Sequence, residues 1–261
     1  MNVTEYLQKW SVSYRDDMLG NIMPFWLKHG LDLRNGGVYT CLDRDGSLID
    51  TTKSVWFQGR FAFTCSYAYN HIEQNPEWLA AAKSTIDFIE QHCFDSDGRM
   101  FFEVTASGEP LRKRRYVFSE TFAAIAMAEY AIASGEREYA EKALKLFKDI
   151  QRFLNTPGVL EPKYWNTVQS KGHSIVMILI NTASRIRAAI ADPALDKQID
   201  DSIALLQKDF MHPEFNALLE TVGSNGEFID TINGRIINPG HCIETSWFIL
   251  EEAKYRNWDK Q

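Results

Sequence analysis

The residues best suited to proton transfer stand together near the end of the chain, in the sequence NPGHCIETSW at positions 238–247. The Pro-Gly pair closes a loop, so we expect a helix to begin at His241. Residues three apart share one helix face, which would place His241, Glu244 and Trp247 together. A helix start favours a neutral imidazole and a nearby carboxylate favours the charged form, so such a pair could exchange protons near neutral pH. The alternative is a helix-capping histidine with an incidental carboxylate.

A second cluster, Trp56-Phe57-Gln58-Gly59-Arg60, carries an always-charged guanidinium on a predicted helix that is otherwise aromatic. We therefore expect Arg60 to be buried and to need a partner. Glu120, the corresponding charge on the next apolar helix, could form a structural ion pair with Arg60 or hold a polar ligand beside it. The sequence leaves both alternatives open.

Several further residues could line a binding cavity. His173 stands at a predicted helix start and is either a cavity-lining side chain or an ordinary helix-start residue. Aromatic side chains could stack on sugar rings, although most aromatic residues in a helical fold belong to the core. The candidates at expected rim positions are Trp56, Tyr39, Tyr116, Trp165 and Trp247.

The motifs of most metal and phosphate sites are missing from the sequence. It contains no His-Glu-x-x-His pair, phosphate-binding glycine loop, Gly-x-Ser-x-Gly turn or complete calcium loop. The four cysteines are widely spaced with no Cys-x-x-Cys pair, which predicts free thiols. We expect no required metal.

The elements that must position these residues are helices, because apolar residues recur at helical spacing in eight segments. The first is expected to bend or break around Gly20 and Pro24. The segments are residues 3–29, 54–69, 76–93, 118–134, 136–154, 173–190, 194–210 and 241–255.

A repeat is visible in this order, because an apolar helix is followed by a half-exposed amphipathic one about every 50 to 60 residues. Long connections with glycine and aspartate turns lead into the apolar helices. We expect short hairpins in three of them, around turns at residues 43–46 and 95–98 and between residues 218 and 237, where turn signals stand at 223–226 and 233–234. The pattern predicts an all-α toroid of helix pairs whose inner helices line a cavity.

Composition excludes several classes of partner. The chain of 261 residues is 45% hydrophobic and carries 28 Lys and Arg against 35 Asp and Glu, a net charge of -7. An acidic chain is not suited to nucleic acid or to an anionic membrane. The sequence has no apolar run of about 20 residues and no secretory signal pattern, so we expect a soluble, cytoplasmic, single-domain protein over residues 1–261.

Five motifs follow one another along the chain: GGVYTCLDRDG at 36–46, KSVWFQGR at 53–60, FSETF at 118–122, MILIN at 177–181 and NPGHCIETSW at 238–247. Their order and spacing resemble the N-acylglucosamine 2-epimerase family across essentially the whole chain. The Gly-Gly-x-x-Thr-Cys-Leu turn is more similar to the N-acylglucosamine branch than to cellobiose epimerases.

The resemblance implies an (α/α)6 barrel that interconverts N-acetyl-D-glucosamine and N-acetyl-D-mannosamine by removing and returning the proton at C2 of the open-chain sugar. It implies no required cofactor, ATP as an allosteric activator in some members, and homodimers. Cellobiose 2-epimerase, an aldose–ketose isomerase, or a catalytically impaired sugar-binding or interaction protein remain alternatives.

By motif position the resemblance assigns His241, Glu244 and Arg60 to catalysis, with Arg60 near the sugar oxygens, and Glu120 to the pocket. Family members continue through further helices and a second catalytic histidine. The present chain ends at Gln261, so we expect about eight of twelve helices and an activity impaired by truncation.

Overall fold

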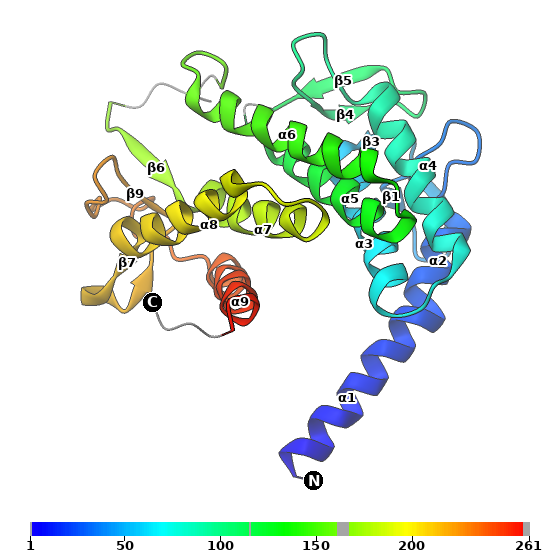
Figure 1. The fold of residues 1–261 in the computed structure, drawn as a ribbon, viewed down its shortest axis with the longest axis horizontal. Helices are drawn as coiled ribbons and strands as arrows, with labels where there is room; N and C mark the ends of the chain where they lie inside the picture. Colours follow the sequence, from blue (N-terminus) through cyan, green and yellow to red (C-terminus); the bar gives the residue numbers. More distant parts are fainter. Residues whose placement is uncertain (1, 115, 161–166, 258–261) are drawn as a thin grey trace. The chain divides into compact units, whose positions relative to one another are not determined.

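The computed structural model describes residues 2–114, 116–160 and 167–257, which form helices joined by loops with short strands (Figure 1). The chain divides into two compact units. The first comprises residues 1–114 with 133–135, and the second comprises residues 115–132 with 136–261. Among the described residues, no helix has the length and apolar character needed to cross a membrane.

The first unit opens with a helix that is interrupted once. Helix α1 (Val3–Asp17) passes through a π-helical turn (Met18–Ile22) into α2 (Met23–His29). Pro24 has no N–H to donate to the carbonyl of Gly20, which accounts for the interruption. The predicted break around Gly20 and Pro24 is confirmed. Every residue of α1 is exposed.

Helices α3 (Val55–His71) and α4 (Pro76–His92) pack against each other in the first unit, close to the predicted bounds (Figure 1). Asn75 caps α4, since its side chain accepts a hydrogen bond from the Glu77 N–H at 2.9 Å. Helix α3 buries few polar side chains, and Gln58 is one of them. Its amide accepts from the Val38 N–H and donates to the Val38 carbonyl, at 2.8 and 2.7 Å.

Five short strands complete the first unit. Strands β1 (Cys41–Leu42) and β2 (Leu48–Asp50) form the hairpin predicted around the turn at 43–46. An antiparallel bridge between Phe94 and Met100 closes the second predicted turn. An antiparallel sheet has the order β3 (Lys53–Ser54), β4 (Phe101–Val104) and β5 (Pro110–Lys113).

A fully buried lysine joins β3 to two loops of the first unit. Lys53 Nζ donates to Asp32 Oδ2 at 2.8 Å and to the carbonyls of Gly36 and Ala106 at 2.7 and 2.9 Å. Burial alone would raise the pKa of Asp32, but hydrogen bonds from Lys53 and Asn35 hold it well below its usual value. Every donor of the ammonium group therefore has an acceptor.

The second unit alternates apolar and amphipathic helices, as predicted. Helix α5 (Phe118–Ser134) is buried from Ser119 to Ala131, whereas α6 (Arg137–Asn155) buries one face. Helix α7 (His173–Ala189) then packs against α8 (Pro193–Leu205) and α9 (Pro239–Tyr255) (Figure 1). A π-helical turn (Leu206–Phe210) continues α8 over the last residues of the predicted segment.

Two expectations for the second unit are wrong. Helix α9 begins at Pro239 rather than His241, because proline suits the first helical position and Asn238 caps the helix. The region from 218 to 237 forms no hairpin of its own: β8 (Ala217–Leu218) pairs with β7 (Met211–His212), and β9 (Thr221–Gly223) pairs with β6 (Ser170–Gly172). Turn signals are local and cannot identify strand partners that are distant in sequence.

Candidate active site

His241 lies in the first turn of α9, where the local sequence fixes its position. The Asn238 side chain accepts a hydrogen bond from the His241 backbone N–H at 3.3 Å. Pro239 restricts the backbone at the helix start. The His241 side chain is one-third exposed, so its ring is anchored by the helix and remains accessible to a ligand.

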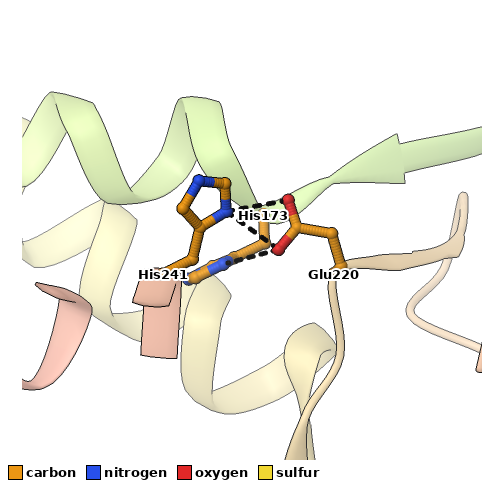
Figure 2. A group of neighbouring side chains, drawn as sticks. All are labelled: His173, Glu220 and His241. Carbon is orange, nitrogen blue, oxygen red and sulfur yellow. Dashed lines mark hydrogen bonds and ion pairs between the residues drawn. The ribbon is translucent and has the colours of Figure 1, made fainter. Parts of the chain in front are cut away.

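The carboxylate of Glu220 holds the His241 ring, as Figure 2 shows. Both Glu220 oxygens lie 3.0 Å from His241 Nδ1. The Glu220 backbone is itself fixed, because its N–H donates to the Ile236 carbonyl at 3.1 Å and its carbonyl accepts from the His173 N–H at 3.0 Å. An ionised carboxylate only accepts hydrogen bonds, so His241 Nδ1 carries the proton.

His173, the first residue of α7, completes the cluster and is 1% exposed. Its Nδ1 lies 3.7 Å from a Glu220 oxygen, and its Nε2 forms a 2.9 Å hydrogen bond with the Thr245 hydroxyl. Burial lowers the pKa of His173, whereas the carboxylate of Glu220 raises it, and a proton on His241 would act in the same direction as burial. Burial therefore favours the neutral form of His173.

The arrangement can perform acid–base chemistry. With Nδ1–H directed at Glu220, Nε2 of His241 keeps a lone pair, and Figure 2 shows that nitrogen pointing away from the carboxylate. A histidine oriented by a carboxylate in this way can take up a proton and return it. The same three side chains offer ligand atoms within 4.8 Å of one another, a set that could also hold a transition metal ion.

Two predicted residues near His241 lie outside this hydrogen-bonded cluster. Among the described residues, the carboxylate hydrogen-bonded to His241 is Glu220 rather than Glu244. Glu244 is partly buried on α9, where the neighbouring residue Thr245 contacts His173. Trp247 is 48% exposed beside Phe248.

Arg60 is exposed, and the expectation that it is buried is wrong. Residues Gln58 and Gly59 occupy the buried side of α3, which turns the guanidinium outward. Arg60 and Tyr39 line a mainly apolar cavity of about 340 Å³ within the first unit. Phe57, Met23 and Trp26 also line this cavity.

The remaining predicted residues are divided between the units. In the first, Trp56 is half-buried and contacts Phe102 edge to face at 5.2 Å. In the second, Glu120 is fully buried on α5 and Tyr116 packs edge to face against Phe118 at 5.4 Å. Arg60 and Glu120 belong to different units, so their pairing stays a prediction. Trp165 lies outside the described residues.

Glu220, which contacts both histidines, was not among the predicted site residues. The available signal was a single carboxylate within the apolar run Leu218-Leu219-Glu220-Thr221-Val222. A charge in such a run needs a partner. Its partners at 173 and 241 have no regular spacing from it, so the pattern did not identify them.

Solved structures of sugar epimerases share this fold. A sugar epimerase from a ruminal bacterium has a TM-score of 0.79 at 22% identity, over 93% of this chain and 65% of that one. Cellobiose 2-epimerase from Bacillus thermoamylovorans has a TM-score of 0.85 at 21% identity, over 97% and 69%. The predicted all-α fold of the (α/α)6-barrel type is confirmed.

Sequence comparison then assigns the family. The sequence model of the N-acylglucosamine 2-epimerase family matches residues 37–261, and the chain belongs to this family. It is 30% identical to N-acylglucosamine 2-epimerase of Bos taurus, over 91% of this chain and 58% of the relative. It is 24% identical to cellobiose 2-epimerase of Dictyoglomus turgidum, over 90% and 63%. The chain thus spans about three fifths of the length of these relatives.

Proposed function

We propose that this chain carries the site of a carbohydrate 2-epimerase, an isomerase that interconverts N-acetylglucosamine and N-acetylmannosamine. The observation that carries the proposal is the His241–Glu220 pair, with both carboxylate oxygens 3.0 Å from Nδ1 and Nε2 directed away. The family assignment and the likeness to bovine N-acylglucosamine 2-epimerase support the choice of substrate.

The reaction is proton transfer at the carbon beside a carbonyl. In the open-chain sugar, His241 Nε2 takes the C2 proton, the C2–H electron pair forms a C1–C2 double bond, and the C1 oxygen becomes negative. A second proton donor then protonates the opposite face of C2, the electron pair of the C1–C2 double bond forms the new C2–H bond and the C1 carbonyl is restored, and His241 releases its proton to solvent. In this proposal Arg60 stabilises the negative oxygen, and Glu244, Glu120 and the aromatic residues hold the sugar.

The proposed reaction also determines which cofactors and which assembly are expected. The reaction as written consumes no oxidant, reductant or nucleotide, so no cofactor is required, and ATP would act only as an allosteric activator. A homodimer, the assembly implied by the resemblance, is checked by the mass of the protein in solution.

The proposal is tested with N-acetylmannosamine in D2O, with and without ATP, by following the C2 proton and the formation of the epimer by NMR. We expect exchange in the unmodified protein and at least a 100-fold slower exchange in His241→Gln, because the proton acceptor is lost. His212→Gln is the matched control, since His212 Nδ1 also bonds a carboxylate, Glu214, at 2.9 Å. Absence of exchange in the folded, unmodified protein would contradict the proposal.

A cellobiose 2-epimerase is the second candidate, favoured by the likeness to such enzymes in both comparisons. The same chemistry acts at C2 of a reducing glucose residue, so cellobiose in the same assay separates the two substrates. Faster exchange with cellobiose than with N-acetylmannosamine would select the second candidate. Binding of either sugar without exchange would identify a binding protein.

A further inference from the structure

We infer that Glu220 is a positioning residue that fixes the His241 ring and its tautomer for proton transfer. The inference rests on the proposed function, because it concerns the same histidine. It assigns the orienting carboxylate to a residue from another part of the fold rather than to Glu244, one helical turn away.

The first support is that the main chain holds Glu220 on both sides. Gly172 pairs with Thr221 in the β6–β9 ladder, and the next hydrogen bond runs from the His173 N–H to the Glu220 carbonyl. The Glu220 N–H is bonded to Ile236, three residues before the α9 start. The segments that carry His173 and His241 therefore both connect directly to the Glu220 backbone.

The second support is that the Glu220 carboxylate lies closer to His241 than to His173. Both oxygens lie 3.0 Å from His241 Nδ1, whereas the contact with His173 Nδ1 is 3.7 Å, which is too long for a hydrogen bond. His173 is buried, which favours its neutral form, and its Nε2 forms a hydrogen bond with the Thr245 hydroxyl. The negative charge of Glu220 is thus available to stabilise the imidazolium that forms when His241 takes a proton.

The third support is the exposure of the cluster. The His173 side chain is 1% exposed, Glu220 is 21% and His241 is 33% exposed. Polar contacts thus run from the buried Thr245 hydroxyl to the accessible ring of His241. Because Glu220 holds the His241 ring, the ring keeps one orientation, which proton transfer to a bound molecule requires.

The test uses Glu220→Gln and Glu220→Ala, with Glu214→Gln as the matched control, since Glu214 makes the surface bond to His212. We expect C2 exchange with N-acetylmannosamine to fall about 100-fold in both Glu220 variants. KM should change by less than about threefold, because Glu220 is not placed against the sugar. The control should keep the unmodified rate, and formate should restore part of the rate of Glu220→Ala.

The second readout is independent of activity. Nitrogen-15 NMR of the histidine rings, assigned with His241→Gln and His173→Gln, should show Nδ1–H at His241 in the unmodified protein. Glu220→Gln should keep this tautomer, because its amide oxygen still accepts the bond, whereas Glu220→Ala should lose it. If the unmodified protein shows no exchange, the proposed function fails while the tautomer still tests Glu220.

Three results would overturn the inference. One is the same His241 tautomer in Glu220→Ala as in the unmodified protein. Another is unmodified exchange in the near-isosteric Glu220→Gln. The third is exchange that is abolished by a chelator and restored by Zn²⁺ or Mn²⁺, which would make His173, Glu220 and His241 metal ligands instead. Near-UV circular dichroism of each variant confirms that the compared proteins are folded.

Discussion

Burial of His173 has a consequence for stability at acid pH. Its pKa in the folded protein lies below the ordinary 6.5, chiefly through burial, so below about pH 6.5 the unfolded chain binds a proton that the native state excludes. We expect the free energy of unfolding to fall as the pH falls through this range, and to be independent of this group above it.

Urea unfolding between pH 5 and pH 8 measures this effect against His173→Gln, which has no proton to gain. The stability advantage of the unmodified protein over the variant should be largest above pH 6.5 and should shrink in acid. Parallel curves for the two proteins would show that His173 takes up its proton equally in both states.

The buried Lys53 makes a second prediction at the scale of a residue. Lys53→Met would leave the Asp32 carboxylate, whose side chain is 2% exposed, without its cation. Breaking a buried ion pair in this way costs about 3–5 kcal/mol of the free energy of unfolding. Lys197→Met, which breaks the exposed pair with Asp201, should cost less than about 1 kcal/mol.

Urea titrations of both variants provide the comparison. Adding Asp32→Asn to Lys53→Met should recover part of the loss, because the uncompensated charge is then removed. Equal losses for Lys53→Met and Lys197→Met would contradict the role given to the buried pair.

Among helices, the capping of α9 links stability to the proposed chemistry. Asn238→Ala removes the side chain that caps the first turn, at a cost of about 1 kcal/mol. Because His241 lies in that turn, we also expect slower C2 exchange. Asn75→Ala removes the corresponding cap of α4 and should cost similar stability without slowing exchange.

Chemical unfolding and the D2O exchange assay together separate the two effects. A loss of exchange in Asn75→Ala as large as that in Asn238→Ala would show that general destabilisation, rather than the position of His241, controls the rate.

Helices were largely predictable because their signals are local. Pro76 marks the start of α4, and the change from an apolar to an amphipathic pattern distinguishes α5 from α6. The side of α3 that is buried was harder to predict, because Gln58 is buried with hydrogen bonds to Val38, whereas Arg60 lies on the exposed side. The pairing of β6 with β9 depends on residues about 50 positions apart and leaves no local signal.

Across the molecule, the candidate site also combines residues that have a local sequence signal with one that has none. The motif at 238–247 singled out His241, whereas the helix start at His173 left open whether that residue lines a cavity or is an ordinary helix-start residue. Glu220 carries no motif, and its proposed role follows only from its contacts with His173 and His241.

Each of the two units contains a buried ion pair. Lys53 pairs with Asp32 in the first unit, and Arg187 pairs with Glu252 in the second.

The β6–β9 ladder also determines when the site can exist during folding. Helices form from neighbouring residues, whereas joining His173 to Glu220 requires closure of a long chain loop, which is entropically costly and slow. A partly folded chain can therefore contain nearly all its helices while Glu220 is still far from both histidines. Helical content measured by far-UV circular dichroism consequently reports the scaffold, and only a signal from the histidine rings reports the assembled site.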